Sequence, residues 1–236
     1  MQGQARQRMT SSLLALMQIV DGAFPTGAFA HSFGLETYVQ EGAVHDGASF
    51  GGFLRNNLRY SVGPCDAVAV CVAHRAARAD DSNALREVDE LISAMKLPEE
   101  TRVAGASIGR RFLGTCARVF DTSAIPQLSG RFLGSKTGRQ HAVAFGAVAA
   151  LLGVPEGDAA AAYLHGHAMA QASAAVRLVP LGGTEAQRVV HSLSGDIAQL
   201  ATQAMARSLD DMSSFTPGLD IASMRHADLS ARLFMS

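Results

Sequence analysis

Gly183-Thr-Glu-Ala-Gln-Arg-Val-Val-His-Ser-Leu-Ser-Gly-Asp-Ile-Ala-Gln-Leu-Ala-Thr-Gln-Ala204 is the stretch that decides the fold class of this 236-residue chain. Apolar side chains recur in it every three or four residues, at Val190, Leu193, Ile197, Leu200 and Ala204. This spacing places them on one stripe of a long helix, whereas a strand would alternate apolar and polar residues. Thr184 is a suitable residue to cap the start of that helix. The stretch therefore predicts a long amphipathic helix.

The same helical spacing recurs through most of the chain, and strand alternation does not. It predicts further helices at 13–20, 50–58, 65–78, 83–96, 98–120, 139–152 and 156–178. Gly63-Pro64 is expected to end the helix that begins at residue 50, because proline lacks the N–H group that a helix interior needs. Residues 123–138 contain Pro126 and three glycines, which predicts a loop or a broken helix there.

These patterns predict an all-α fold in a single domain. No internal repeat, low-complexity tract or long linker divides the chain, so residues 1–215 are expected to form one unit of roughly eight to ten packed helices. Two parts depart from the helical pattern. One is an irregular N-terminal loop rich in Gly, Pro and Phe, and the other is a C-terminal tail at residues 216–236.

Composition narrows the classes of partner. The formal net charge is −1 and no Lys/Arg cluster extends beyond pairs, which argues against nucleic acid. Charged residues make up 17% of the chain, below the usual quarter, and this favours a protein that buries part of its surface against other proteins. The three cysteines, Cys65, Cys71 and Cys116, follow no disulfide-framework spacing, as expected in a reducing compartment.

The N-terminus resembles a signal peptide only superficially. Two arginines precede an apolar stretch at residues 13–20, and Ala28-Phe-Ala30 looks like a cleavage site. However, Gln18 and Asp21 interrupt the apolar stretch, and Pro25 lies between it and the apparent cleavage site. An amphipathic first helix explains the pattern better, and no membrane span is expected.

The run Asp21-Gly-Ala-Phe-Pro-Thr-Gly-Ala-Phe-Ala-His-Ser-Phe-Gly-Leu-Glu36 has the most unusual composition in the chain. It combines three glycines, a proline, a histidine and three phenylalanines in sixteen residues. Loops are normally polar, so this much aromatic side chain beside turn residues indicates a backbone wedged into a packed surface. An ordinary core helix does not need this composition.

A phosphate-binding loop is suggested by Gly130-Arg-Phe-Leu-Gly-Ser-Lys-Thr137, but the match fails in two ways. A P-loop needs glycine directly before the Lys-Thr pair, and Ser135 occupies that position. The motif must also follow a buried strand, and residues 124–129 do not read as one. The run is better explained as a turn that carries two cations.

Metal-binding and nucleophilic chemistry have only partial candidates. Cys71 and His74 are three residues apart on a predicted helix and could supply half of a zinc or nickel site, although a buried structural pair explains them as well. His31 and Glu36 are five apart, and the HExxH zinc motif is absent. No GxSxG nucleophile elbow occurs. A helical metalloprotein or hydrolase that uses one of these pairs therefore stays open as the alternative function.

Four stretches resemble the urease accessory protein F (UreF) family. Residues 21–36 are similar to its N-terminal signature D-x-x-F-P-T-G-x-F-x-H-S-x-G-L-E, a long and specific motif. The remaining matches are Gly63-Pro-Cys-Asp66, Arg177-Leu-Val-Pro-Leu-Gly182, and Leu219-Asp-Ile-Ala-Ser-Met-Arg-His226 followed by Arg232-Leu-Phe234. Together they span nearly the whole chain. Between His226 and Arg232 the sequence lacks the tyrosine that family tails often carry.

The resemblance implies a cytoplasmic helical protein that is not an enzyme and needs no cofactor. Members of this family are scaffolds of urease maturation that link UreD (UreH in some organisms) to the GTPase UreG, so that nickel reaches apo-urease. They are thought to influence GTP hydrolysis by UreG and commonly form homodimers. A P-loop belongs to UreG in this scheme, which fits its absence here.

Within this resemblance, the two signatures become hypotheses about partner-binding surfaces. The predicted partner-binding residues are Phe29, His31, Ser32, Glu36, Met224, Arg225, His226, Arg232, Leu233 and Phe234. Phe24 and Phe33 could equally fill the protein's own core. The tail at 216–236 has little helical stripe of its own, so we expect it to become ordered on a partner, with UreD as the expected one.

Overall fold

The computed structural model describes residues 2–131, 139–229 and 232–234 of the chain. Helices dominate the described part, and it contains no strand. The α-helices are α1 (Gln2–Val20), α2 (Leu35–Gln40), α3 (Gly47–Asn57), α4 (Val68–Arg78), α5 (Ser82–Met95), α6 (Glu99–Val119), α7 (Ala124–Arg131), α8 (His141–Leu151), α9 (Glu156–Leu178), α10 (Gly183–Ser192), α11 (Ser194–Met205) and α12 (Pro217–Arg225). Short 3₁₀ turns lie at η1 (Ala28–Ala30), η3 (Leu209–Asp211) and η4 (His226–Asp228), and a π-helical segment, η2 (Leu58–Ala67), joins α3 to α4. The all-α prediction is confirmed.

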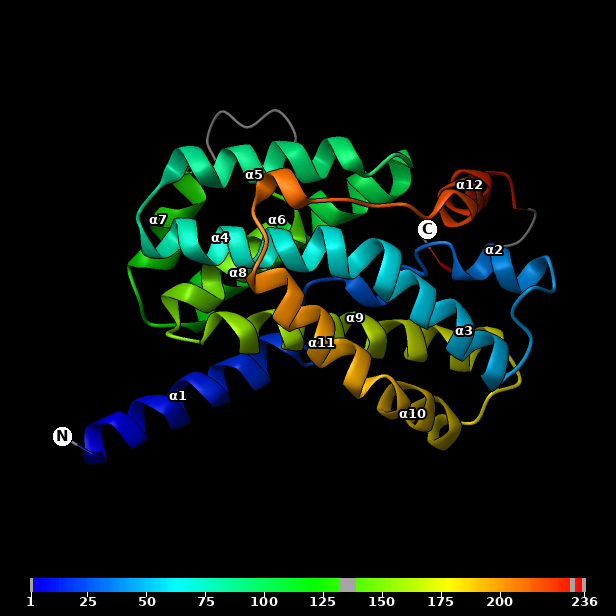
Figure 1. Cartoon of the computed structure of the whole chain (residues 1–236), viewed down its shortest axis with the longest axis horizontal. Coiled ribbons are helices and arrows are strands. Elements are labelled where there is room, and N and C mark those ends of the chain that lie inside the picture. The colour runs from blue at the N-terminus through cyan, green and yellow to red at the C-terminus, as the bar shows by residue number, and fades with distance from the viewer. Residues whose placement is uncertain (1, 132–138, 230–231, 235–236) are drawn as a thin grey trace.

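The centre of the bundle is the pair α4 and α8. Residues 142–149 of α8 are all buried, so this helix is apolar on every side, as a fully enclosed helix must be. Helices α4, α6 and α9 pack around it, as Figure 1 shows. Gly146 lies directly against the Val70 backbone of α4, where an added Cβ would overlap the Val70 carbonyl oxygen. The two helix axes can approach this closely because position 146 has no side chain.

The predicted helix end at Gly63-Pro64 is wrong, because α3, η2 and α4 run on without a break. Pro64 cannot donate to the carbonyl of Tyr60 one turn earlier, and the chain widens into a π-helix there. The freed Tyr60 carbonyl accepts a hydrogen bond from Phe215 N (2.8 Å), and the Pro64 carbonyl accepts one from Ser213 N (3.1 Å). The segment that leads to the C-terminus thus supplies the missing backbone partners.

Other differences concern where helices break. The long helix predicted around 190–204 is divided at Leu193 into α10 and α11, although Leu193 itself is fully buried as its stripe predicted. Ser192 and Ser194 donate to the carbonyls of Val189 and His191, which competes with the helical hydrogen bonds. The region predicted as a loop or broken helix contains α7 (Ala124–Arg131), and residues 132–138, with most of the P-loop-like run, lie outside the described residues.

The first helix is longer than predicted, and its N-terminal part projects away from the bundle (Figure 1). Near its end α1 packs on α9, where Leu16 and Ile19 are buried. Met9, Leu13 and Met17 of the same helix are exposed. Across the described residues, no helix combines the length and the apolar character that crossing a bilayer requires.

We predict that Gly146→Ala destabilises the protein by roughly 2–3 kcal/mol, because the new methyl group forces α4 and α8 apart. Urea-induced unfolding of the purified protein measures the change. Gly52→Ala in α3 is the matched control, since nothing lies within 4 Å of its added Cβ. The control should stabilise by about 0.5–1 kcal/mol through helix propensity. Equal effects of the two variants would contradict the close packing of α4 on α8.

Candidate functional site

Residues 21–36 form a sequence of tight turns that leads into α2. Gly27 (φ 79°), Phe33 (φ 49°) and Gly34 (φ 85°) adopt the left-handed conformation, which costs a non-glycine residue such as Phe33 about 1–2 kcal/mol. At Gly34 an added Cβ would also meet the side chains of Leu219 and Ser223 on α12. Glycine therefore serves two needs at position 34, and both orient α2 so that Glu36 in its first turn points inward.

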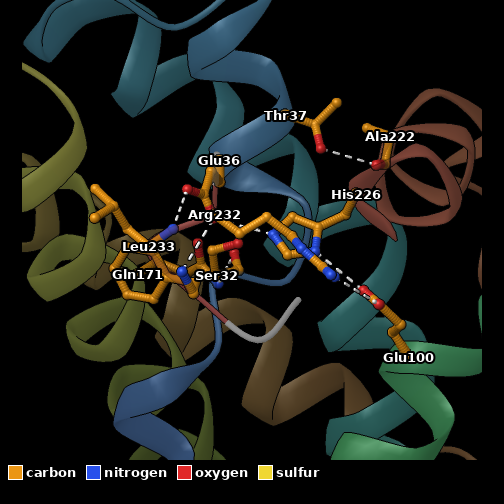
Figure 2. A network of polar contacts seen from close by, with 10 residues as sticks. Ser32, Glu36, Thr37, Glu100, Gln171, Ala222, His226, Arg232 and Leu233 are labelled. Atoms are coloured by element: carbon orange, nitrogen blue, oxygen red, sulfur yellow. Dashed lines mark hydrogen bonds and ion pairs between the residues drawn. The ribbon is translucent and has the colours of Figure 1, made fainter. Parts of the chain in front are cut away.

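Glu36 joins the N-terminal signature to the C-terminal one (Figure 2). Its carboxylate is only 1% exposed and accepts hydrogen bonds from Leu233 N (2.7 Å) and Phe234 N (3.2 Å). The same carboxylate lies 3.0 Å from the Nε2 atom of His226. Two backbone donors and the facing imidazole, all from the chain's own C-terminal part, thus compensate the cost of burying this group.

His226 is fully buried between two carboxylates. Its Nε2 atom faces Glu36 and its Nδ1 atom lies 3.0 Å from Oε2 of Glu100 in α6, a residue not selected from the sequence. A neutral imidazole has one donor and one acceptor nitrogen, whereas carboxylates only accept. The arrangement therefore needs one more proton, carried by the ring or by one of the two carboxyl groups. The guanidinium group of Arg232 places a cation 3.5 Å from Glu100.

Side chains from α2 and α9 support this network. Thr37 Oγ1 donates to the Ala222 carbonyl of α12 (2.9 Å), and Gln171 Nε2 donates to the Ser32 carbonyl (3.1 Å), as Figure 2 shows. The guanidinium group of Arg177, at the end of α9, lies 4.3 Å from the ring centre of Phe234. Signature segments that are nearly 200 residues apart in sequence thus form one continuous cluster.

The ten predicted partner-binding residues divide into a buried and an exposed group. Buried are His31, Ser32, Glu36, His226 and Phe234, and exposed are Met224, Arg225, Arg232 and Leu233. The side chain of Phe29 lies outside the described residues. Leu233 is 74% exposed although its backbone N–H is fixed by Glu36. The tail, expected to become ordered on a partner, is held here by the chain itself and contains the short helix α12.

The other signature phenylalanines lie against the core. Phe24 is buried and contacts Phe112, with ring centres 5.8 Å apart. Phe33 is partly buried and lies between His31 and His167, at 5.6 and 6.0 Å. Burial is the main cause that lowers the pKa of His31, and the positive charge of Arg111 adds to it. Phe24, which is buried against Phe112, therefore packs as a core residue in this chain.

A cavity of about 520 Å³ opens beside this cluster, and sequence reasoning did not predict it. A polar group at its wall consists of an ion pair between Lys96 and Asp66, with Tyr163 donating to Asp66 at 3.3 Å. Burial opposes the charge on Lys96, but the adjacent Asp66 carboxylate outweighs it and raises the pKa of Lys96. Asp66 comes from the Gly-Pro-Cys-Asp motif, so the π-helical turn places the carboxylate here.

Three imidazoles, those of His141, His165 and His167, line the same cavity, and two of them make specific contacts there. His167 Nε2 lies 3.0 Å from Oδ1 of Asn57, and His141 is in ring contact with Phe112, Phe145 and Tyr163. Burial lowers the pKa of His141 and of His167 from 6.5 to about 4. Both rings are therefore neutral at physiological pH, and the cavity wall also carries the Lys96–Asp66 ion pair and the acidic side chains of Asp21 and Asp220.

The residue pairs considered for the alternative enzyme or metal site, Cys71/His74 and His31/Glu36, have contacts within the fold. The Nε2 atom of His74 lies 2.8 Å from the Val154 carbonyl, and burial raises the pKa of the Cys71 thiol to about 12, far from an activated thiolate. Glu36 already accepts from the tail, as described above. Among the described residues, no group of three or more His, Cys, Asp or Glu side chains is arranged to hold a metal ion.

Fold and site together define an all-α protein in which the N-terminal and C-terminal signatures meet in one buried polar network. Comparison with known proteins agrees with this description. The family model UreF matches residues 44–194, which lie between the two signatures. This chain belongs to the UreF family.

Individual relatives extend the similarity to both signatures. The "Urease accessory protein UreF" of Bradyrhizobium diazoefficiens (strain JCM 10833 / BCRC 13528 / IAM 13628 / NBRC 14792 / USDA 110) is 36% identical over 234 residues, which cover 99% of this chain and 96% of the relative. The protein of the same name from Arthrobacter sp. (strain FB24) is 35% identical over 94% of this chain and 96% of its own length. That from Rhodopseudomonas palustris (strain BisA53) is 37% identical, over 97% and 94% respectively.

The neutral cavity histidines predict a specific loss of stability in acid. The unfolded chain takes up a proton on each histidine near pH 6.5, whereas the folded chain resists protonation until about pH 4. The unfolded state binds more protons in this window, so the free energy of unfolding should fall as the pH falls from 6.5 to 4. Each imidazole should contribute on the order of 3 kcal/mol. Urea unfolding at a series of pH values measures this dependence.

His141→Phe tests whether the cavity histidine is the source. Phenylalanine can keep the contacts to the neighbouring aromatic rings but does not titrate. The variant should therefore lose stability less steeply than the parent between pH 6.5 and 4. Identical slopes for variant and parent would show that His141 is not protonation-resistant in the folded chain.

Proposed function

We propose that this chain is a non-catalytic accessory protein of urease maturation. It links UreD to the GTPase UreG, so that nickel, the cargo of the pathway, reaches apo-urease. Membership of the UreF family supports this role, because relatives named urease accessory protein UreF align over nearly the whole chain. The chain needs no cofactor of its own in this role. Its three cysteines are free, which is in keeping with a cytoplasmic protein.

The observation that carries the proposal is the exposed side of the ordered tail. Met224 and Leu233 are 50% and 74% exposed, yet the backbone beside Leu233 is fixed on Glu36. Apolar side chains on an immobilised backbone bind with little further loss of entropy. Arg225 and Arg232 are also exposed and add positive charge next to them. This face is the contact for UreD.

The buried residues among those predicted to bind a partner have a supporting role instead. Glu36, His226 and Phe234 are covered by the chain itself, so they support the face and leave the contact to the exposed residues. UreG joins the complex through another surface, and the scaffold adjusts the rate at which UreG hydrolyses GTP. The chain forms a homodimer, for which light scattering of the purified protein is the direct test.

Substituting the two exposed apolar tail residues tests the contact. Met224→Asp with Leu233→Asp should reduce co-purification of UreD at least tenfold, since hot-spot truncations commonly cost 2 kcal/mol or more. Val119→Asp is the matched control and should retain UreD. Val119 is an exposed apolar residue at the last position of α6, whereas Glu100, which contacts the tail, is in the first turn of that helix. Far-UV circular dichroism checks that all three proteins keep their helices.

Two outcomes would contradict the proposal. Undiminished recovery of UreD by the double variant would show that the tail face is not the contact. Turnover of a substrate by the purified chain alone, lost on Cys71→Ser or His74→Gln, would favour the alternative enzyme. GTP hydrolysis by UreG, measured with and without the chain, tests the regulatory part, and an unchanged rate would remove it.

A further inference from the structure

The C-terminal segment forms one wall of the cavity. We name residues 213–228 the C-terminal strap. Its cavity-lining residues are Ser214, Leu219, Asp220 and Ser223. The facing wall comes from the core and includes Val62 and Asp66 of η2 and Tyr163 of α9. Removal of the strap would therefore expose this further side of the cavity, and the Lys96–Asp66 pair at its wall, to water.

Helix α12 within the strap has two distinct sides. Asp220 and Ser223, three residues apart, face the cavity, whereas Ile221 and Met224, also three apart, are each 50% exposed to solvent. Residues at this spacing share one face of a helix. The side that a partner can reach and the side that lines the cavity thus belong to the same nine-residue helix.

Polar contacts hold the strap in place more than apolar burial does. Only Ala222 and Ser223 of α12 are buried, and such small side chains remove little apolar surface from water. At one end Ser213 N and Phe215 N donate to the carbonyls of η2. At the other end His226 lies between Glu36 and Glu100. Attachment of the far end therefore depends on the buried Glu36 carboxylate.

We propose that the C-terminal strap is a removable wall of the cavity, locked by Glu36 and His226, and that a protein partner on the Ile221/Met224 side opens it. The second half rests on the function proposed above, in which the tail face receives UreD. Binding energy at the exposed side is then used to break the contact of His226 with Glu36, while Leu233 N stays on the Glu36 carboxyl group, and the polar cavity wall becomes accessible to solutes. The first half concerns this chain alone and stands or fails without any partner.

A cysteine placed in the cavity reports whether the wall is closed. Val62→Cys is nearly isosteric, and Val62 is 5% exposed and lines the cavity on η2. The rate of its alkylation by iodoacetamide, followed by mass spectrometry of the full chain, measures access. Native Cys71 and Cys116 are fully buried and serve as internal controls for global unfolding.

Adding Glu36→Ala to Val62→Cys should raise the alkylation rate of Cys at position 62 at least about tenfold, because losing a hydrogen bond to a charged group shifts a local opening equilibrium by that much. Glu41→Ala is the matched control. It breaks only the exposed ion pair of Glu41 with Arg225, and the rate should stay as in the parent. An unchanged rate with Glu36→Ala would overturn the proposal.

Two further arms separate the possible failures. If Glu36→Ala also makes Cys71 and Cys116 react, the chain has unfolded. Glu36→Gln then replaces Glu36→Ala, because the amide keeps one acceptor but cannot carry a charge opposite His226. An unchanged alkylation rate with Glu36→Gln would equally overturn the proposal. UreD added to the Val62→Cys protein should raise the rate as Glu36→Ala does. Bound UreD without a faster rate would refute opening by the partner, whereas no binding of UreD would refute the function proposed above and leave the Glu36 result intact.

Discussion

A buried carboxyl group that meets two backbone N–H donors and an imidazole is the interaction on which the arrangement of both chain ends depends. Glu36 receives Leu233 N, Phe234 N and the His226 ring, all from the last eleven residues of the chain. An uncompensated buried charge costs several kcal/mol, and breaking a buried pair commonly costs about 3–5 kcal/mol. The position of the tail is therefore set by the requirement to satisfy one side chain in α2.

That requirement explains the unusual residues around Glu36. Gly34 gives the chain a left-handed turn and leaves room for Leu219 and Ser223, so that α12 can lie beside α2. Thr37 then reaches the Ala222 carbonyl one residue further along. Glycine, glutamate and threonine in this order serve a contact within the chain, which is why the stretch does not look like either a core helix or a solvent-exposed loop.

Local pattern was sufficient to predict most helices and insufficient for the connections between them. Helix α9 begins at Glu156 and ends at Leu178 as its sequence indicates, because Pro155 and the acidic first turn are local signals. The π-helical path through Pro64 was not predictable in this way. It requires Ser213 and Phe215 to supply backbone donors from 149 or more residues away. The cavity was not predictable for the same reason, because its wall combines residues that are distant in sequence, from both halves of the chain.

The candidate site shows the same division. Both signatures were visible in the sequence, but their mutual contact was not, and Glu100 and Gln171 carried no motif that marked them. Since Glu36 and His226 join the two ends, the exposed apolar residues beside them are ones with less distinctive chemistry, Ile221, Met224 and Leu233. The signature therefore identifies the buried network that positions the tail, whereas the exposed residues, which form the contact face in the function proposed above, are not constrained by that network.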